Sequence, residues 1–333
     1  MKILITGGTG LVGYGIRKVV EKKMQNVNVD SKGTMNEYVF LSSQDCDLTN
    51  YWRTQKLFNE IRPDFVIHLA ACVGGLFKNM NQKVEMFEKN ILINTNVVQC
   101  SYNCGVKRMV CCLSTCIFPD KTTYPINEKM LHDGPPHSSN DAYAYSKRML
   151  EVQCNAYNQQ HGTDYICVIP TNIYGENDNY SLQDGHVIPA LIHKCYLAKT
   201  SGEDFVVRGT GKPLRQFIYA EDLARLILWV LKNYNEKTPI ILSVGERDEV
   251  SIETVAREIA RAYDYEDRIR FDDSFSDGQF KKTADNGKLM KYMEEDLETG
   301  VGGELMDFQF TGITEGIQRS VRWFGENYSV CRK

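Results

Sequence analysis

Hydrophobic and polar positions along the first half of the chain fall into two alternating patterns. Short apolar runs, typical of buried strands, cover residues 2–6, 38–41, 64–70, 108–113 and 165–169. Stretches with helical spacing lie at residues 11–23, 85–104 and 141–161, and the last two end at Gly105 and Gly162. Strands alternating with helices of this length are joined by right-handed crossovers. The pattern therefore predicts an α/β fold with a doubly wound parallel sheet.

The pattern changes after Pro170. Residues 172–216 are rich in Asn, Asp and Gly and contain one helical piece at 189–198. Residues 216–230 predict a short strand and a helix that return to the first sheet. Further helices are predicted at 251–264 and 313–327. We therefore expect two domains, one formed by residues 1–171 with 216–245 and a smaller C-terminal lobe formed by residues 172–215 with 246–333.

Composition and charge exclude several classes of protein. The 333 residues are 42% hydrophobic and 25% charged, with a net charge of −4, which argues against a disordered chain. No run of Lys or Arg suggests nucleic-acid binding, and no stretch approaches the roughly 18 consecutive apolar residues of a membrane span. The apolar run before Gly7 is too short for a secretory signal. Eleven cysteines, without paired C-x-x-C spacing, indicate neither a disulfide framework nor a metal site, so we expect a cytoplasmic protein.

A glycine motif follows the first predicted strand. Gly7, Gly10 and Gly13 stand between that strand and the first helix. Glycines there allow a tight turn and let a dinucleotide pyrophosphate approach the N–H groups of the helix N-terminus. A glycine turn needed only for packing is the alternative, but the strand–helix context favours a cofactor. The first domain is thus predicted to be a Rossmann-type dinucleotide-binding domain.

The end of the second strand indicates which cofactor binds. An NAD-binding chain usually places an acidic residue there for the ribose 2′-hydroxyl. Here Ser42 and Ser43 end the strand and the first carboxylate is Asp45. A 2′-phosphate is not repelled at this position, which favours NADP(H), although no arginine stands there either.

Three residues predict carbonyl chemistry. Tyr143 and Lys147 are four apart on a predicted helix and therefore lie on one face. An ammonium beside a phenol lowers a pKa that starts near ~10, which suits proton transfer to a carbonyl oxygen. A Tyr–Lys pair at this spacing is common by chance. Ser114, at the carboxyl end of the preceding strand where sheet ligands bind, makes the functional interpretation the stronger one.

These features together resemble the extended short-chain dehydrogenase/reductases that act on nucleotide sugars. Within that family the similarity is closest to the enzymes that epimerise and reduce a GDP-linked keto sugar, and it covers nearly the whole chain. The segments that carry it are residues 73–76, 114–119, 170–175, 186–189 and 277–282. The resemblance implies conversion of GDP-4-keto-6-deoxy-D-mannose to GDP-L-fucose by 3,5-epimerisation and NADPH-dependent reduction at C4, in a homodimer formed through the helices at 85–104 and 141–161.

The resemblance also implies roles for the candidate catalytic residues. Cys116 is the base and His186 the acid of the epimerisation, while Ser114, Tyr143 and Lys147 hold the C4 oxygen and protonate it. A thiol with a pKa near ~8.5 is easily shifted toward thiolate by positive charge, and histidine titrates near neutral pH. Without the resemblance, Cys116 would be taken for a buried structural cysteine.

Binding residues are carried over in the same way. The cofactor contacts implied are Gly7, Gly10, Leu11, Val12, Gly13, Asp47, Leu48, Ala70, Ala71, Lys147, Pro170, Asn172, Ile173 and His186. The substrate contacts implied are Asn172, Lys194, Arg208, Arg215 and Asp277. Three positions depart from the family pattern: Arg208 replaces a tryptophan, Lys194 replaces the arginine of bacterial members, and Glu176-Asn177 replaces Pro-His.

Two other classes of function remain possible on sequence grounds. One is another nucleotide-sugar enzyme of this fold, a 4-epimerase or a dehydratase. A dehydratase would show an Asp-Glu pair where this chain has Thr115-Cys116, and a 4-epimerase needs no Cys/His pair. The other is a non-catalytic NADP-binding scaffold, whose signature would be the loss of Tyr143 or Lys147; both are present.

Overall fold

The computed structural model describes residues 1–26, 36–275, 277, 279–299, 305 and 308–333. Among these residues a central sheet has six parallel strands. In spatial order they are β10 (Ile240–Leu242), β5 (Tyr165–Pro170), β4 (Arg108–Cys112), β3 (Phe65–His68), β1 (Lys2–Thr6) and β2 (Glu37–Phe40). The chain adds β2 on one side of β1 and the later strands on the other. Ligands of such sheets bind at the carboxyl ends of the strands beside this switch point.

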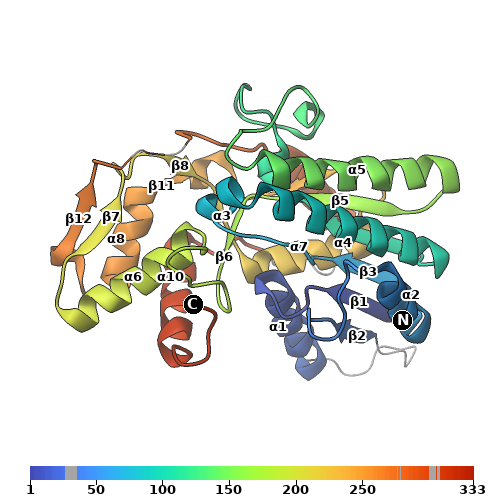
Figure 1. Cartoon of the computed structure of the whole chain (residues 1–333), viewed down its shortest axis with the longest axis horizontal. Helices are drawn as coiled ribbons and strands as arrows, with labels where there is room; N and C mark the ends of the chain where they lie inside the picture. Colours follow the sequence, from blue (N-terminus) through green and yellow to red (C-terminus); the bar gives the residue numbers. More distant parts are fainter. Residues whose placement is uncertain (27–35, 276, 278, 300–304, 306–307) are drawn as a thin grey trace.

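Helices cover both faces of the sheet (Figure 1). Helices α1 (Leu11–Asn26) and α7 (Ala220–Asn233) pack together on one face, and α2 (Tyr51–Ile61), α4 (Lys83–Asn103) and α5 (Asp141–His161) cover the other. Both faces need a cover because successive side chains of a strand point to opposite faces and apolar ones lie on each. In β1, Ile3 and Ile5 pack in the hydrophobic cluster beneath α1 and α7, and Leu4 packs in the cluster on the opposite face. The predicted doubly wound α/β fold is confirmed.

A third hydrophobic cluster builds the smaller lobe at the left of Figure 1. It is formed mainly by α6 (Val187–Ser201), α8 (Ile252–Ala262) and α10 (Ile313–Glu326), with the parallel pair β7 (Phe205–Arg208) and β12 (Ile269–Asp272). The remaining elements are β6 (Asn172–Tyr174), β8 (Leu214–Arg215), β9 (Phe217–Tyr219), β11 (Val250–Ser251), α3 (Leu76–Asn81), α9 (Gly287–Thr299) and the 3₁₀ helices Thr115–Ile117, Glu128–Met130, Glu246–Asp248 and Glu266–Arg268.

Most predicted elements appear within a few residues of their expected bounds, and α5 has the bounds that its spacing and Gly162 predicted. The prediction that the strand within 216–230 returns to the main sheet was wrong. That strand, β9, pairs with β6, and β10 takes the sheet edge instead. Phe217 and Tyr219 of β9 pack in the third cluster, whereas Leu289 and Met293 of α9 pack in the first. The proposed division into domains stays a prediction.

Helices α2, α3 and α9 were not predicted from the sequence. Helix α2 buries only Thr54 and Phe58 and leaves Trp52 exposed. Its start is fixed instead by Asn50, whose side chain accepts a hydrogen bond from the Arg53 N–H at 3.0 Å. Across the described ranges, every helix is too short or too polar to cross a membrane.

Candidate active site

A cavity of about 830 Å³ opens over the carboxyl ends of the central strands. Its wall includes the glycine turn after β1, the segment after β4, the start of α5 and the loop that leads from β6 to α6. A mostly apolar cavity with a few convergent polar groups at a switch point of an α/β sheet is where ligands of this fold bind. Four predicted catalytic residues line it: Ser114, Tyr143, Lys147 and His186.

The glycine turn is packed so closely that side chains cannot be accommodated. Gly7 has φ +69°, and a Cβ there would lie 2.8 Å from the Ala70 nitrogen. A Cβ on Gly13 would lie 2.6 Å from the Gly8 backbone. The turn therefore leaves the first N–H groups of α1 facing the cavity, a cradle that fits the diphosphate of a dinucleotide.

All the cofactor contacts expected from the sequence line this one cavity: Gly7, Gly10, Leu11, Val12, Gly13, Asp47, Leu48, Ala70, Ala71, Lys147, Pro170, Asn172, Ile173 and His186. Ser42 and Ser43 also line it at the end of β2. The nearby carboxylate of Asp45 accepts hydrogen bonds from the Ser42 N–H and hydroxyl, both at 2.7 Å. The residues present thus fit the group that the sequence favoured.

The Tyr143–Lys147 pair has the predicted spacing but a different electrostatic balance. Lys147 is buried; its Nζ donates to the Cys112 carbonyl at 2.8 Å and lies 5.9 Å from the Tyr143 ring centroid. Burial lowers the pKa of Lys147. Burial also raises the pKa of Tyr143 well above its ordinary value. The expectation of a lowered phenol pKa was wrong, because burial raises the pKa and the nearby thiols of Cys116, Cys112 and Cys72 raise it further. The phenol is held protonated, as a proton donor requires.

Ser114 and Cys116 lie in the turn after β4. The Ser114 Oγ accepts a hydrogen bond from the Cys116 N–H at 3.4 Å and caps the short 3₁₀ helix Thr115–Ile117. Ser114 and Thr115 form the cavity wall here, and Cys116 is buried beside them. Burial raises the pKa of the Cys116 thiol, against the opposing effects of Lys282 and Ser114. The positive charge of Lys282 therefore favours the thiolate as expected, but the effect of burial on the pKa is larger.

Lys282 is a functional candidate that sequence reasoning missed. Burial lowers the pKa of its ammonium, and Cys116 acts in the opposite direction, which places the two groups within electrostatic reach. Its neighbour Lys281 turns instead to Glu246, at 3.1 Å. Lys282 belongs to the segment 277–282 that carried part of the resemblance, but two adjacent lysines in a sequence look like ordinary surface charge.

His186 stands at the first turn of α6. It is the N-cap residue, yet its side chain makes no capping hydrogen bond to the helix. The imidazole is accessible from the cavity while protein surrounds it, and this enclosure lowers the pKa of His186. Among the residues that the structure describes, no hydrogen bond engages this imidazole, so it is suited to exchange a proton with a bound ligand.

The predicted substrate contacts are divided between two places. Asn172 lines the cavity and donates to the Gln216 carbonyl at 2.9 Å. Lys194, Arg208, Arg215 and Asp277 lie in the smaller lobe, outside the residues that line the cavity. Burial and then the nearby Arg208 lower the pKa of Lys194, so these two cations lie close together.

The other smaller-lobe residues already have partners within the protein. The Arg208 guanidinium lies 4.6 Å from the Phe275 ring centroid. Arg215 donates to the Gln279 carbonyl at 2.6 Å, and Asp277 accepts from the Thr210 N–H at 2.9 Å. These contacts fix the orientations of the side chains.

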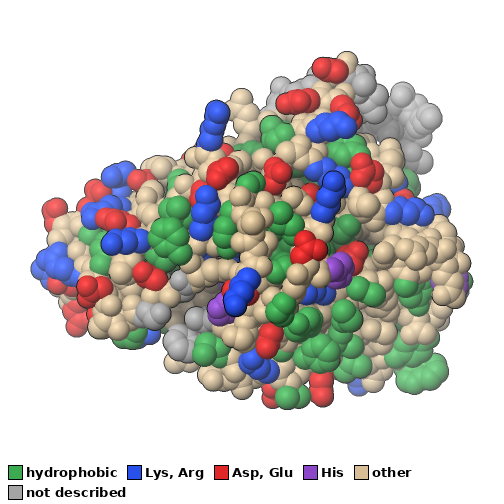
Figure 2. All heavy atoms as spheres, turned by 90° about the horizontal axis from the view of Figure 1, so that it is seen from above, with side chains coloured by type: hydrophobic (Ala, Val, Ile, Leu, Met, Phe, Trp, Pro, Cys, Tyr) green, Lys and Arg blue, Asp and Glu red, His purple; other side chains and the backbone are tan. Residues whose placement is uncertain are grey.

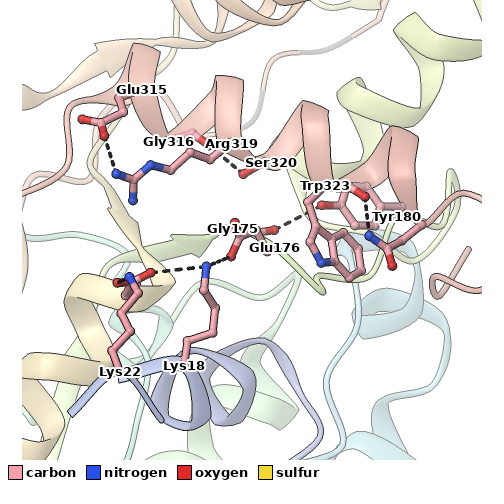
Figure 3. Close-up of polar contacts among 12 residues, drawn as sticks. Lys18, Lys22, Gly175, Glu176, Tyr180, Glu315, Gly316, Arg319, Ser320 and Trp323 are labelled. Atoms are coloured by element: carbon pink, nitrogen blue, oxygen red, sulfur yellow. Dashed lines mark hydrogen bonds and ion pairs between the residues drawn. The ribbon is translucent and has the colours of Figure 1, made fainter. Parts of the chain in front are cut away.

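Glu176 and Asn177, which depart from the family pattern, connect the two lobes. Figure 3 shows Lys18 of α1 pointing at Glu176, with which it forms an ion pair; Lys18 also lies 3.4 Å from Glu221. The Asn177 side chain donates to the carbonyl of Thr9, in the glycine turn, at 3.1 Å. The loop after β6 is thereby joined directly to the cofactor cradle.

Known proteins support this interpretation. Residues 3–245 match the NAD dependent epimerase/dehydratase family. The chain is 52% identical to a GDP-L-fucose synthase of Dictyostelium discoideum, over 99% of this chain and 97% of that protein. It is 30% identical to the GDP-L-fucose synthase of Escherichia coli, over 90% and 94%. A solved GDP-L-fucose synthetase of Naegleria fowleri bound to NADP superposes with a TM-score of 0.90 at 45% identity, covering all of this chain and 95% of that one.

The chain belongs to the NAD dependent epimerase/dehydratase family, the class of enzymes that its sheet, glycine turn and Tyr143–Lys147 pair define. Within this family of extended short-chain dehydrogenase/reductases, its place is among the GDP-L-fucose synthases, which it matches over nearly its whole length. The resemblance predicted from the sequence, including that of an epimerase-reductase, is confirmed.

Proposed function

We propose that this protein converts GDP-4-keto-6-deoxy-D-mannose to GDP-L-fucose, by epimerisation at C3 and C5 followed by NADPH-dependent reduction at C4. The observation that carries the proposal is that Ser114, Tyr143, Lys147 and His186 line one cavity with the dinucleotide cradle, and that Cys116 lies two residues from Ser114. A thiol and an imidazole add nothing to a simple reductase, whereas an epimerase needs a base and an acid.

Epimerisation begins at the keto group, which acidifies the protons on C3 and C5. The Cys116 thiolate removes a proton, and His186 returns one on the opposite face. Ser114 and Tyr143 donate hydrogen bonds to the C4 oxygen, where negative charge develops. Lys282 stabilises the thiolate, because a nearby ammonium favours the ionised thiol that burial disfavours.

Reduction at C4 uses Tyr143 and Lys147 of the same site. When bound, NADPH supplies the hydride for C4. Tyr143, held protonated by burial, gives its proton to the C4 oxygen. Lys147 then stabilises the phenolate that remains, since its ammonium is fixed 5.9 Å from the Tyr143 ring centroid by the Cys112 carbonyl. The lysine thus acts after proton transfer rather than before it.

The GDP portion is held by the smaller lobe. Lys194 and Arg215 supply positive charge for the diphosphate, and Asp277 and Asn172 supply polar contacts. Arg208 replaces the tryptophan of other members with a guanidinium plane already stacked on Phe275. That flat surface is suited to stack on guanine.

The protein acts as a homodimer in the cytoplasm. Large hydrophobic side chains are exposed on α4 and α5, which pack against each other: Val84, Phe87, Leu92, Tyr145, Met149 and Val152. Figure 2 looks onto the side of α5 and shows hydrophobic side chains between charged ones. This α4–α5 patch is suited to self-association about a two-fold axis. Eleven free cysteines, most of them buried, suit a reducing compartment.

Val152→Glu is expected to convert the dimer to a monomer, because a carboxylate would have to be desolvated within the α4–α5 patch. Size-exclusion chromatography with light scattering measures the mass. Trp52→Glu is the matched control, since Trp52 is 78% exposed on α2, outside the patch, and that variant should stay dimeric. A dimeric Val152→Glu protein would contradict the interface.

The decisive assay supplies GDP-4-keto-6-deoxy-D-mannose with NADPH. NADPH absorbance is expected to fall, and GDP-L-fucose is expected to accumulate in equal amount by chromatography and mass spectrometry. Turnover of a UDP-sugar without NADPH loss would instead indicate a 4-epimerase of the same fold. NADPH binding without any turnover of these sugars would indicate the scaffold alternative.

A further inference from the structure

The residues that follow α10 reach the cavity wall through Arg332. We call residues 327–333 the strap. The Tyr180 N–H donates to the Arg332 carbonyl at 2.8 Å, and Asn179 and Arg332 form a parallel β-bridge. The Cys331 N–H donates to the Asn327 carbonyl at 2.9 Å. Figure 1 shows this end of the chain beside α6 and α10. Backbone hydrogen bonds thus fix the register of the strap against the loop that follows β6.

This register sends the two cations of the strap in different directions. Arg332 lines the cavity, and its Nη2 donates to the Asn177 carbonyl at 2.6 Å. Lys333 turns back on the strap itself, where its Nζ lies 3.7 Å from the Tyr328 ring centroid. Tyr328 in turn packs against Tyr196 of α6, with ring centroids 4.5 Å apart. Arg332 therefore faces the cavity and Lys333 does not.

Asn177 links Arg332 to the glycine turn. Its carbonyl accepts from the guanidinium, and its side-chain amide donates to the Thr9 carbonyl at 3.1 Å. Asn177 holds a left-handed backbone conformation, with φ +60°, which asparagine adopts more readily than most residues. A single residue thus separates Arg332 from the turn whose N–H groups face a dinucleotide diphosphate.

The charged side chains on the cavity wall show which cation is available to a ligand. Among the described lining residues, the acidic side chains are Asp47, Asp178 and Asp184, and the Lys and Arg side chains are Lys147 and Arg332. Lys147 is buried and bonded to the Cys112 carbonyl. A guanidinium has five N–H donors, and Asn177 uses one of them. A diphosphate that enters this cavity therefore meets Arg332 as its available cation.

The nearest carboxyl competes weakly for that guanidinium. Asp178 is buried, and its Oδ2 has no hydrogen-bond partner within the described part of the chain. Burial raises the pKa of Asp178 to about 7, against smaller opposing effects of the Asn179 N–H and Arg332. A carboxyl that is only partly ionised at neutral pH leaves most of the charge of Arg332 for a ligand.

We propose that Arg332 binds the diphosphate of the nicotinamide cofactor, so that the strap adds a cation to the cradle formed by the glycine turn. A guanidinium can bind two phosphate oxygens at once, which a lysine cannot. The inference rests on the proposed function only for the identity of the cofactor. The strap and the dinucleotide-binding domain are far apart in the sequence, so the site is complete only after the lobes have packed.

The test measures dissociation constants of NADPH and NADH by titration of the reduced cofactor's fluorescence, without sugar substrate. Arg332→Ala is expected to weaken both cofactors by about tenfold, because the diphosphate is common to them. Arg332→Lys should lie between that variant and the wild type. Lys333→Ala, which removes the same charge from the neighbouring position, should change either constant by less than about twofold.

Two results would overturn the assignment. Unchanged binding of both cofactors to a folded Arg332→Ala protein, verified by its melting temperature and circular dichroism, would show that the strap does not reach the diphosphate. Weakened binding of NADPH alone would place Arg332 at the 2′-phosphate instead. Wild-type protein that binds neither cofactor would refute the proposed function together with this inference, which separates the two failures.

Discussion

Cys116→Ser is expected to abolish solvent exchange at C3 and C5 of the keto sugar while leaving cofactor binding intact. A serine hydroxyl has a far higher pKa than a thiol, so the base is lost, and general base catalysis is worth about 10²–10⁴-fold. The measurement is deuterium uptake from heavy water by mass spectrometry, with NADPH omitted so that reduction cannot intervene.

Cys104→Ser is the matched control for this change. It makes the same sulfur-to-oxygen replacement at a half-buried cysteine that follows α4 and precedes β4, so the length of β4 separates it from the turn that holds Cys116. Its exchange rate should equal that of the wild type. Exchange retained by Cys116→Ser within about tenfold would be too small a loss for a general base and would remove Cys116 from the mechanism.

The pH dependence of the same exchange follows from the two pKa shifts. Burial raises the pKa of Cys116 above its ordinary 9.0 and lowers that of His186 below 6.5. The productive thiolate–imidazolium pair is therefore a minor form of the enzyme, whose fraction is constant between the two pKa values and falls outside them. The exchange rate should show a broad plateau. It should decline on the acid side, where both groups are protonated, and on the alkaline side, where both are deprotonated.

Lys282→Met should lower the plateau and move its alkaline limit upward, because the positive charge that lowers the pKa of Cys116 is removed.

Tyr143→Phe is expected to separate the two half-reactions in the opposite sense. Loss of the phenolic proton should slow NADPH oxidation by about 10²–10⁴-fold, since the C4 alkoxide is no longer protonated by a positioned acid. Deuterium exchange at C3 and C5 should fall less, by roughly 10- to 100-fold, because Tyr143 then loses only one hydrogen bond to a developing charge, worth about 1.5–3 kcal/mol, and Ser114 remains. Rapid-mixing measurement of NADPH absorbance reports the first quantity.

Tyr145→Phe serves as the control for this second experiment. Tyr145 is the neighbouring phenol on α5, and it is exposed rather than buried in the cavity wall. Both half-reactions should proceed at wild-type rates in that variant. Equal losses of exchange and reduction in Tyr143→Phe would show that the phenol is required for both steps and that the roles are not divided.

Local features of the chain were predictable because their determinants are close together in sequence. The glycine turn needs only Gly7, Gly10 and Gly13 between a strand and a helix. The Tyr143–Lys147 pair needs only one helical turn, and Ser114 and Cys116 need only the short turn after β4. The cofactor contacts also lie at element ends that one sheet edge brings together. The signals for the roles of Cys116 and His186, in contrast, came from resemblance and not from spacing.

Features that depend on distant parts of the chain were not predictable in the same way. Helix α2 was missed although Leu57, Phe58 and Ile61 form an apolar face, which is covered only when the helix packs against the cluster shared with α4. The strand β9 was assigned to the wrong sheet, since strand pairing is decided between segments far apart in sequence. Lys282 and Arg332 looked like ordinary surface cations until the fold turned one toward Cys116 and the other toward the cavity.

The amino-acid sequence by itself determined the alternation of strands and helices, the dinucleotide-binding turn and the Tyr143–Lys147 pair, because each is set by spacing within a few residues. The tertiary structure alone decided the direction in which the pKa values of Tyr143, Cys116 and His186 shift. A pKa reports how many water molecules and charges surround a group, and these come from segments that meet only when the two lobes pack together. The same packing decides which cations face the ligand.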